Sequence, residues 1–419
     1  AGDDANAYGG FLAGTLQVAV ATEGAADVDF VNKSKSVVKH AATVVATGAE
    51  DAWAYGIAGV GVAQVGYGES GSDVDLKNQG SIAVTSNVKA TAVTDEAVAF
   101  ALTGVGVGQA SISTKVATAT LTNDTGATID VGAKAVGKGV GPVQSTGIVG
   151  AGVGQIAVST GEGTATTKLV NKGSIKATAT AAATATGAAG GPGDFALANA
   201  GVLGGVVQGA LSLDGSTVSV DNSGVIAVKA DADAKSAKSA GIAQAEATAV
   251  VQSATGSTAT FKNTSKVIST AEANATGVLP SSANAGAAGL TQDVTPNATT
   301  KVAKASAVNQ GTMTIVAKAT SVGANGGGAG AEAIGIMQDR GYVAGTTTSA
   351  VLDNSGTLKV SASADAKGIT GATKTTAGAE AAGYRAEGFS TYDVKNASGK
   401  LIDVSATAKA LDDAEADAL

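Results

Sequence analysis

Alternation of apolar and polar residues is the dominant pattern along this chain. In segment 352–366, which reads LDNSGTLKVSASADA, an apolar residue stands two places before Asn354 and a glycine two places after it. From Leu358 onward every second side chain is apolar, at first large and then alanine. This alternation predicts a β-strand with one buried face, and Asn-Ser-Gly predicts a tight turn before it.

The same arrangement recurs along the whole chain, which indicates that one unit has been copied about nine times at intervals of about 45 residues. Apolar residues follow the turn asparagine by four and six places in most copies, as Ile226 and Val228 follow Asn222. Two extra residues after Asn123 and Asn396 preserve the inward face, since an even shift keeps the side-chain phase. The nine turn asparagines are Asn32, Asn78, Asn123, Asn171, Asn222, Asn263, Asn309, Asn354 and Asn396.

A second repeated motif precedes each asparagine and consists of a glycine, two further residues and a glutamine. Its ninth copy, Gly383-Tyr-Arg-Ala386, has no glutamine. Each unit is therefore predicted to hold three strands: one around the glutamine, one ending at the asparagine and one with alternating Val and Ala. Segments such as 187–199 and 321–330 are predicted to be connecting loops. The glutamines assigned to the motif are Gln17, Gln64, Gln109, Gln155, Gln208, Gln244, Gln292 and Gln338.

These patterns predict an all-β fold, a parallel β-helix (β-solenoid) of about nine repeats with one wide coil per repeat. Stacked at the usual strand spacing, nine coils would give a rod about 45 Å long. A propeller also has repeats of this length, but its blades usually carry aromatic signatures, and the only tryptophan here is Trp53. We expect an N-terminal lead-in at 1–16, one solenoid domain at 17–410 and an acidic tail at 411–419.

In such a solenoid the equivalent amides of successive coils would lie above one another. Each amide could then donate a hydrogen bond to one neighbour and accept one from the other, which predicts an Asn ladder and a Gln ladder. The alternative is that Asn is present only because it suits a turn, and that Gln is a surface residue.

Composition narrows the possible functions. Aromatic residues make up 3% of the chain and Gly accounts for 59 residues, which suits thin, closely stacked layers. The net charge of -8 argues against a nucleic-acid partner. Cysteine is absent, so disulfides and thiolate chemistry are excluded. The most apolar window, 148–158, is Gly-rich and too short for a transmembrane helix.

Candidate catalytic and ligand-binding residues are few. His40 is the only histidine and is expected to be a hydrogen-bonded or exposed strand residue. Segment 132–139 resembles a phosphate-binding loop, but Gly139 stands where that loop needs Ser or Thr. The carboxylate pairs Asp231/Asp233 and Asp73/Asp75 are expected to lie on solvated strand faces. We therefore predict no enzyme activity, no cofactor and no metal site.

The phrases LVNKGSIKATATAAATATG, VDNSGVIAVKADADA and LDNSGTLKVSASADA resemble the Ala/Thr/Gly-rich repeats of bacterial autotransporter passengers and related haemagglutinin-like surface proteins. The resemblance implies a right-handed parallel β-helix, export across the outer membrane, and a role at the cell surface or in a matrix. Such passengers normally precede a C-terminal membrane β-barrel, whereas segment 411–419 is acidic. The expectation is thus a passenger separated from its barrel or a free secreted subunit; the acidic start would suit a mature N-terminus.

The leading functional expectation is a secreted structural protein whose solenoids associate head to tail into an extracellular or cell-surface filament. This follows from repetition without bulky end caps, because uncapped sheet edges accept further strands. The alternative expectation is an adhesive protein whose connecting loops bind a host or surface glycan.

Overall fold

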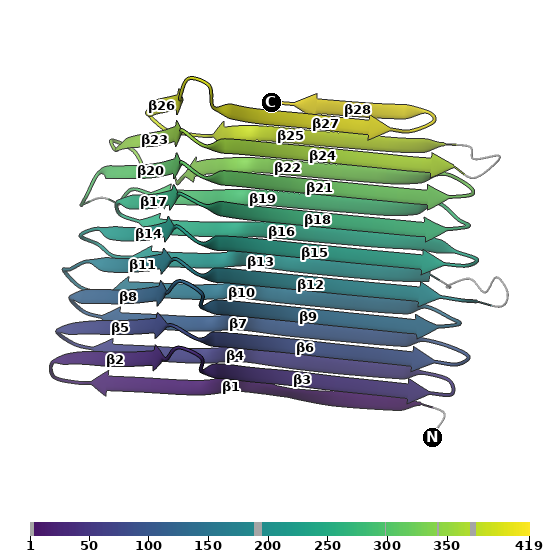
Figure 1. Cartoon of the computed structure of the whole chain (residues 1–419), viewed down its shortest axis with the longest axis horizontal. Helices are drawn as coiled ribbons and strands as arrows, with labels where there is room; N and C mark the ends of the chain where they lie inside the picture. Colours follow the sequence, from purple (N-terminus) through teal and green to yellow (C-terminus); the bar gives the residue numbers. More distant parts are fainter. Residues whose placement is uncertain (1–3, 188–194, 298, 342, 369–373) are drawn as a thin grey trace.

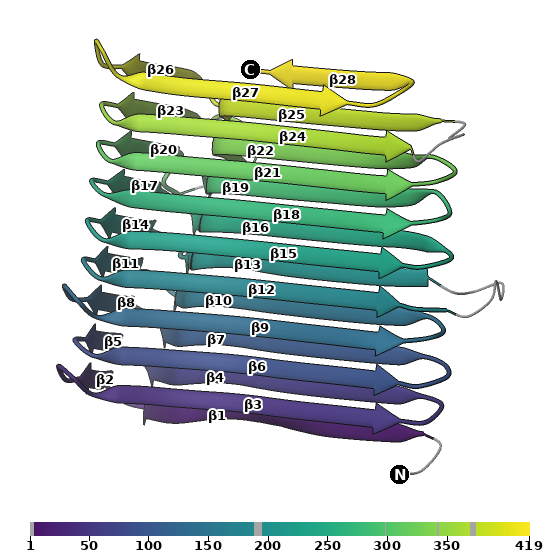
Figure 2. The same ribbon diagram turned by 45° about the vertical axis from the view of Figure 1, so that its right-hand side comes forward.

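The computed structural model describes residues 4–187, 195–297, 299–341, 343–368 and 374–419. These residues form 28 β-strands and no helix. The strands are arranged in three parallel sheets that run the length of the molecule (Figure 1). A view turned by 45° shows the stacked coils from a second side (Figure 2). Most buried apolar residues form one cluster along the solenoid, and a smaller second cluster lies between the long and short strands. The predicted parallel β-helix is confirmed.

The first sheet is built from the strands around the glutamine motif, and we call it the long-strand sheet. Its ten members, in spatial order, are β1 (Ala5–Ala21), β4 (Ala52–Gly68), β7 (Ala97–Ser113), β10 (Val143–Ser159), β13 (Phe195–Leu211), β16 (Ala240–Thr255), β19 (Ser281–Thr295), β22 (Gly327–Arg340), β25 (Thr375–Ala386) and β28 (Asp413–Ala418).

The second sheet, the short-strand sheet, contains the strands that end at the turn asparagines. Its nine members are β2 (Ala25–Asn32), β5 (Gly71–Asn78), β8 (Val116–Asn123), β11 (Ala165–Asn171), β14 (Ser216–Asn222), β17 (Thr258–Asn263), β20 (Val302–Asn309), β23 (Thr347–Asn354) and β26 (Thr391–Asn396).

The third sheet, the medium-strand sheet, contains the alternating Val/Ala strands. Its nine members are β3 (Val37–Gly48), β6 (Ser81–Ala92), β9 (Thr128–Gly139), β12 (Ser174–Ala185), β15 (Val225–Ser236), β18 (Lys266–Gly277), β21 (Thr312–Gly323), β24 (Thr357–Gly368) and β27 (Leu401–Lys409).

One coil consists of a long, a short and a medium strand in chain order, so each repeat makes one coil as predicted. The register keeps equivalent residues opposite one another: Ile82 pairs with Ile129, and Ile129 with Ile175. The two-residue insertion after Asn123 therefore preserves the inward face.

Small inward residues let the long and medium strands approach closely. Ala230, Ala232 and Ala234 in β15 are fully buried, as are larger residues such as Ile226 nearer the turn. A core made chiefly of Ala and Val still removes apolar surface from water along the whole axis, because every coil covers the next.

The glycine of the glutamine motif lies at a kink in most of the long strands, where two consecutive residues such as Gly61 and Val62 in β4 both face inward. A Cβ at Gly61 would lie 2.3 Å from Cγ2 of Val84 and 2.7 Å from the carbonyl oxygen of Gly106. The close approach of backbone and core therefore requires glycine here.

The solenoid extends further at both ends than the sequence analysis predicted. Strand β1 begins at Ala5, so most of the expected lead-in 1–16 belongs to the first coil. Strand β28 lies inside the expected acidic tail 411–419, because alternating alanines allow that segment to pair with β25. Of the predicted loops, 321–330 is mostly strand, and 188–194 lies outside the described residues.

Candidate functional site

The nine turn asparagines form one hydrogen-bonded ladder, which confirms that prediction. The side-chain Nδ2 of each of the first eight donates to Oδ1 of the asparagine in the next coil, at 2.7–2.9 Å. Asn78, Asn171 and Asn222 are among the members that are completely buried. The ladder therefore ties all nine coils together along one edge of the core.

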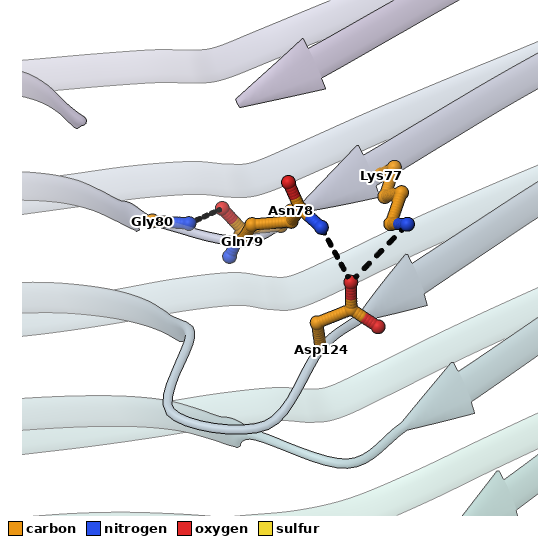
Figure 3. A network of polar contacts seen from close by, with 5 residues as sticks. All are labelled: Lys77, Asn78, Gln79, Gly80 and Asp124. Carbon is orange, nitrogen blue, oxygen red and sulfur yellow. Dashed lines mark hydrogen bonds and ion pairs between the residues drawn. The ribbon is translucent and has the colours of Figure 1, made fainter. Parts of the chain in front are cut away.

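Backbone groups of the turns also hold most of these asparagines, as Asn78 illustrates. The backbone N–H of Gly80 donates to Oδ1 of Asn78, and Nδ2 of Asn78 also donates to the carbonyl oxygen of Thr128. On the outside of this turn, Asp124 of the next coil accepts a hydrogen bond from Gln79 at 3.0 Å and lies 3.5 Å from the ammonium of Lys77 (Figure 3). The inner amide is thus held by backbone, whereas the outer contacts are partly exposed to solvent and contribute little to stability.

A second ladder runs along the inner side of the long strands. Each glutamine Nε2 donates to Oε1 of the glutamine in the preceding coil, at 2.7–3.1 Å. The same Nε2 groups also donate to carbonyl oxygens of the short strands, as Gln155 does to Ala119 and Lys168. The Gln ladder therefore joins the long and short sheets, and its bonds point in the opposite direction to those of the Asn ladder.

The assignment of Gln244 to this ladder is wrong. Gln244 is exposed near the start of β16 and pairs with Asn199 and Asn284, whereas Gln252 pairs with Gln208 and Gln292. Gln252 donates to Gln208 and accepts from Gln292. In this coil the glycine has been replaced by Ala249, so the Gly-x-x-Gln pattern matched a different segment. The Val-Val-Gln sequence shared by 206–208 and 250–252 was the available signal. The other seven assignments are confirmed.

Tyr384 terminates the Gln ladder in the coil that lacks a glutamine. Its phenolic oxygen donates to Oε1 of Gln338 at 2.7 Å. Burial, with a smaller contribution from Tyr392, raises the pKa of Tyr384 to about 12, which keeps the phenol protonated as a donor. Sequence analysis did not identify this role.

His40 lies at the inner side of the first coil. Its ring is 5.6 Å from that of Phe11, and its buried Nε2 has no hydrogen-bond partner. The expectation that His40 is hydrogen-bonded or exposed is therefore wrong for this nitrogen. A Cβ at Gly14 would overlap the imidazole, so the motif glycine of this coil provides the space for the ring.

The candidate catalytic segments do not converge. Segment 132–139 lies within the regular strand β9. Asp231 is paired with Lys229 at 3.2 Å, and Lys229 also contacts Glu272 at 3.2 Å. Burial, and then repulsion from Asp75 and other nearby carboxylates, raises the pKa of Asp73. Within the described residues no three His, Cys, Asp or Glu side chains are grouped so as to hold a metal ion.

A shallow groove of about 700 Å³ crosses the outer face of the long-strand sheet from β16 to β28. Its floor includes Gly286, Gly330 and Gly378, and amides and carboxylates line it. Glu332 pairs with Glu380, which pairs with Asp417, so three carboxylates form a column on adjacent strands. The groove lies on a sheet face rather than among the connecting loops.

The two end coils expose strand edges that no other described strand pairs with. The N-terminal end coil, β1 to β3, leaves Leu16, Val31 and Val37 at least half exposed, and core residues Phe11 and Phe30 are only partly covered. At the C-terminal end the edge strands of the three sheets are β26, β27 and β28, which we call the C-terminal end coil. Strands β26 and β28 are exposed throughout, including Tyr392 and Val394, and β27 is exposed at every second residue. At these two ends of the described molecule, backbone groups at strand edges lack a neighbouring strand and core residues are only partly covered.

No helix among the described residues is long and apolar enough to cross a membrane. Comparisons with protein-family models, with curated proteins and with solved structures found no match to this chain.

Proposed function

We propose that this chain is a structural subunit, secreted to the bacterial surface or extracellular matrix, whose solenoids associate head to tail into a filament. The observation that carries the proposal is the pair of open end coils. Each presents three unpaired strand edges around a partly covered apolar core. Unpaired edges are templates for further strands, and an end-to-end contact between two different surfaces does not close into a ring.

The two ends are also chemically complementary. At the N-terminal end the Asn ladder terminates in Oδ1 of Asn32, an acceptor that no other asparagine reaches. At the C-terminal end it terminates in Nδ2 of Asn396, a donor that bonds to the carbonyl oxygen of Lys400 and to no other asparagine among the described residues. Stacking of two copies would let the ladder continue across the junction.

Sedimentation velocity and electron microscopy of the purified chain test this function. We expect unbranched fibres of the width of one coil, with association that increases with protein concentration. A chain that stays monomeric at high concentration, with intact secondary structure by circular dichroism, would refute it.

A second candidate is glycan binding, and the groove on the long-strand sheet is the observation in its favour. Amides such as Gln244 and Asn284 lie beside carboxylates over a glycine floor, which offers hydrogen-bond donors and acceptors to sugar hydroxyls. Binding to immobilised glycans should then be lost on Asn284→Leu and retained on substitution of exposed residues in the connecting loops, such as Lys238→Ala. The reverse result would support binding by the loops.

A further inference from the structure

We propose that strand β28 occupies the position that β1 of a second copy must take, so that filament growth requires displacement of β28 from the edge of β25. This inference rests on the proposed head-to-tail function and specifies its junction. It follows from the order of strands in a coil, from the register and from the charge on β28.

The register of the short and medium sheets defines the junction. Continued by one coil, it places Val394 against Phe30 and Asn396 against Asn32 of the second copy. The same continuation places Ile402 against Val38.

These contacts are favourable. Apolar core residues meet apolar core residues, the Asn ladder gains one bond, and on the outer face Asp403 lies opposite Lys39 of the second copy. Opposite charges on directly paired residues stabilise a sheet.

The long-strand sheet cannot accept the same continuation without a change. Along the chain each short strand is preceded by a long strand. If β2 of the second copy lies on β26, the β1 that precedes it must lie on β25. The edge of β25 is already covered by β28 over Thr376–Ala381. Followed through the sheet, the register makes Asn6 equivalent to Asp413 and Phe11 equivalent to Ala418.

Strand β28 is the weaker of the two competitors. It pairs with β25 at six positions, whereas β1 pairs with β4 at fifteen. All six residues of β28 are exposed, while the ring of Tyr8 in β1 stacks on that of Tyr55 at 5.2 Å. We therefore expect β28, rather than β1, to leave.

Charge also favours the exchange. Asp417 in β28 lies directly opposite Glu380, which itself lies opposite Glu332. Like charges on directly paired residues destabilise a sheet. In the exchanged junction Gly10 of the second copy replaces Asp417 beside Glu380, and Tyr8 replaces Glu415 beside Gly378, where a side chain has open space. Both strands place small residues inward at equivalent positions, Ala7 with Ala414 and Gly9 with Ala416, whereas β1 would bring Phe11 to the position of Ala418 and so add apolar area to the core.

A disulfide between β28 and β25 tests the displacement, since the native chain has no cysteine. Glu380→Cys with Asp417→Cys joins directly paired residues about 4.8 Å apart, within disulfide range. The matched control, Glu332→Cys with Glu380→Cys, joins β22 to β25 and leaves β28 free. We expect oxidation to stop fibre growth of the first variant and reduction to restore it. Oxidation should not affect the control.

Two further changes to the chain probe the same junction. Deletion of residues 411–419 should shorten the lag before assembly severalfold, provided that circular dichroism shows the solenoid intact. Val31→Cys with Lys395→Cys should crosslink copies only in the proposed register, whereas Val31→Cys with Asp393→Cys places the cysteines about 8 Å apart and should not crosslink.

The outcomes separate the two proposals. If the locked variant assembles as fast as the reduced one, or if deletion of 411–419 prevents assembly of a folded chain, the displacement of β28 is refuted while the filament function stands. If neither the native nor the deleted chain assembles, the filament function fails and the displacement fails with it.

Discussion

Both amide ladders join neighbouring coils by side-chain hydrogen bonds, but they lie at different places in the coil. The Asn ladder lies at a tight turn, where backbone N–H groups such as that of Gly80 also reach the side-chain oxygen. The Gln ladder lies between two sheets, where Gln155 donates to two backbone carbonyls besides its neighbour. The asparagine oxygens of some turns thus accept from backbone donors, whereas the glutamine nitrogens donate to backbone carbonyls of the short strands. The position of an amide in the coil, rather than its chemistry, should therefore decide how much unfolding free energy is lost when it is substituted.

The strongest way to expose this difference is to replace one amide of each ladder by a carboxylate. Gln155→Glu would place a buried carboxylate against three acceptor oxygens, those of Gln109, Ala119 and Lys168. We expect a loss of about 3–5 kcal/mol of unfolding free energy at pH 7. Asn78→Asp faces only two acceptors, Asn123 and Thr128, and keeps the N–H of Gly80, so it should cost less.

Acid should rescue the Gln155→Glu variant. Burial raises the folded-state pKa of the introduced carboxyl above its unfolded value of about 4.3. The penalty is therefore present at neutral pH and disappears as the pH falls through the raised folded-state value. Denaturant unfolding of this variant and the native chain at pH 7 and pH 4 measures the effect. Equal losses of unfolding free energy for Gln155→Glu and Asn78→Asp would contradict the expected difference between the two ladders.

The corrected register predicts a large difference between two neighbouring glutamines. Gln252→Ala should cost about 2–3 kcal/mol, because it removes the donor to Oε1 of Gln208 and to the carbonyl oxygen of Thr260, and the acceptor of Nε2 of Gln292. Gln244→Ala should stay within about 0.5 kcal/mol, since Gln244 is exposed. Amide hydrogen exchange of β16 and its neighbours in the two variants locates the change. A larger loss for Gln244→Ala would restore the original assignment.

The end of the Gln ladder should show a smaller effect. Tyr384→Phe removes the donor to Oε1 of Gln338 and should cost about 1 kcal/mol, confined to the last coils. Hydrogen exchange should rise in β22 and β25 and remain unchanged near β4. The control is Tyr67→Phe, which changes an outward phenol that is 43% exposed. Protection that falls evenly along the rod would contradict a local role.

The smallest effect should come from outside both ladders. Asp73 lies beside Asp27, Asp29 and Asp75, and burial and their charges raise its pKa. The folded-state pKa of Asp73 exceeds its unfolded value, so stability should increase slightly as the pH falls through the raised folded-state pKa, the reverse of ordinary acid denaturation. The ladder amides do not titrate and therefore do not contribute to this increase. An asparagine at position 73 does not titrate either, so Asp73→Asn should remove it. Thermal unfolding at several pH values measures it, and an unchanged response would assign the increase to other carboxylates, such as Asp293.

The sequence alone determined the repeat, the three strands per coil and all nine members of the Asn ladder. These features follow from local rules: side chains alternate along a strand, and a turn residue has fixed neighbours within a few positions. The Gln ladder was less certain, because its residues lie in long strands with a kink. A short motif such as Gly241-Ile-Ala-Gln244 can then mimic it eight residues out of place.

Only the tertiary structure decided the features that depend on stacking between coils. The opposite directions of the two ladders, the role of Tyr384 as terminator and the unpartnered nitrogen of His40 follow from which coil lies next to which. The segment 411–419 had looked like an acidic tail. Its alanines face inward only because the edge of β25 is there to receive them, and that edge places Asp417 beside Glu380. Charge and alternation are local properties, but their consequence depends on the neighbouring strand.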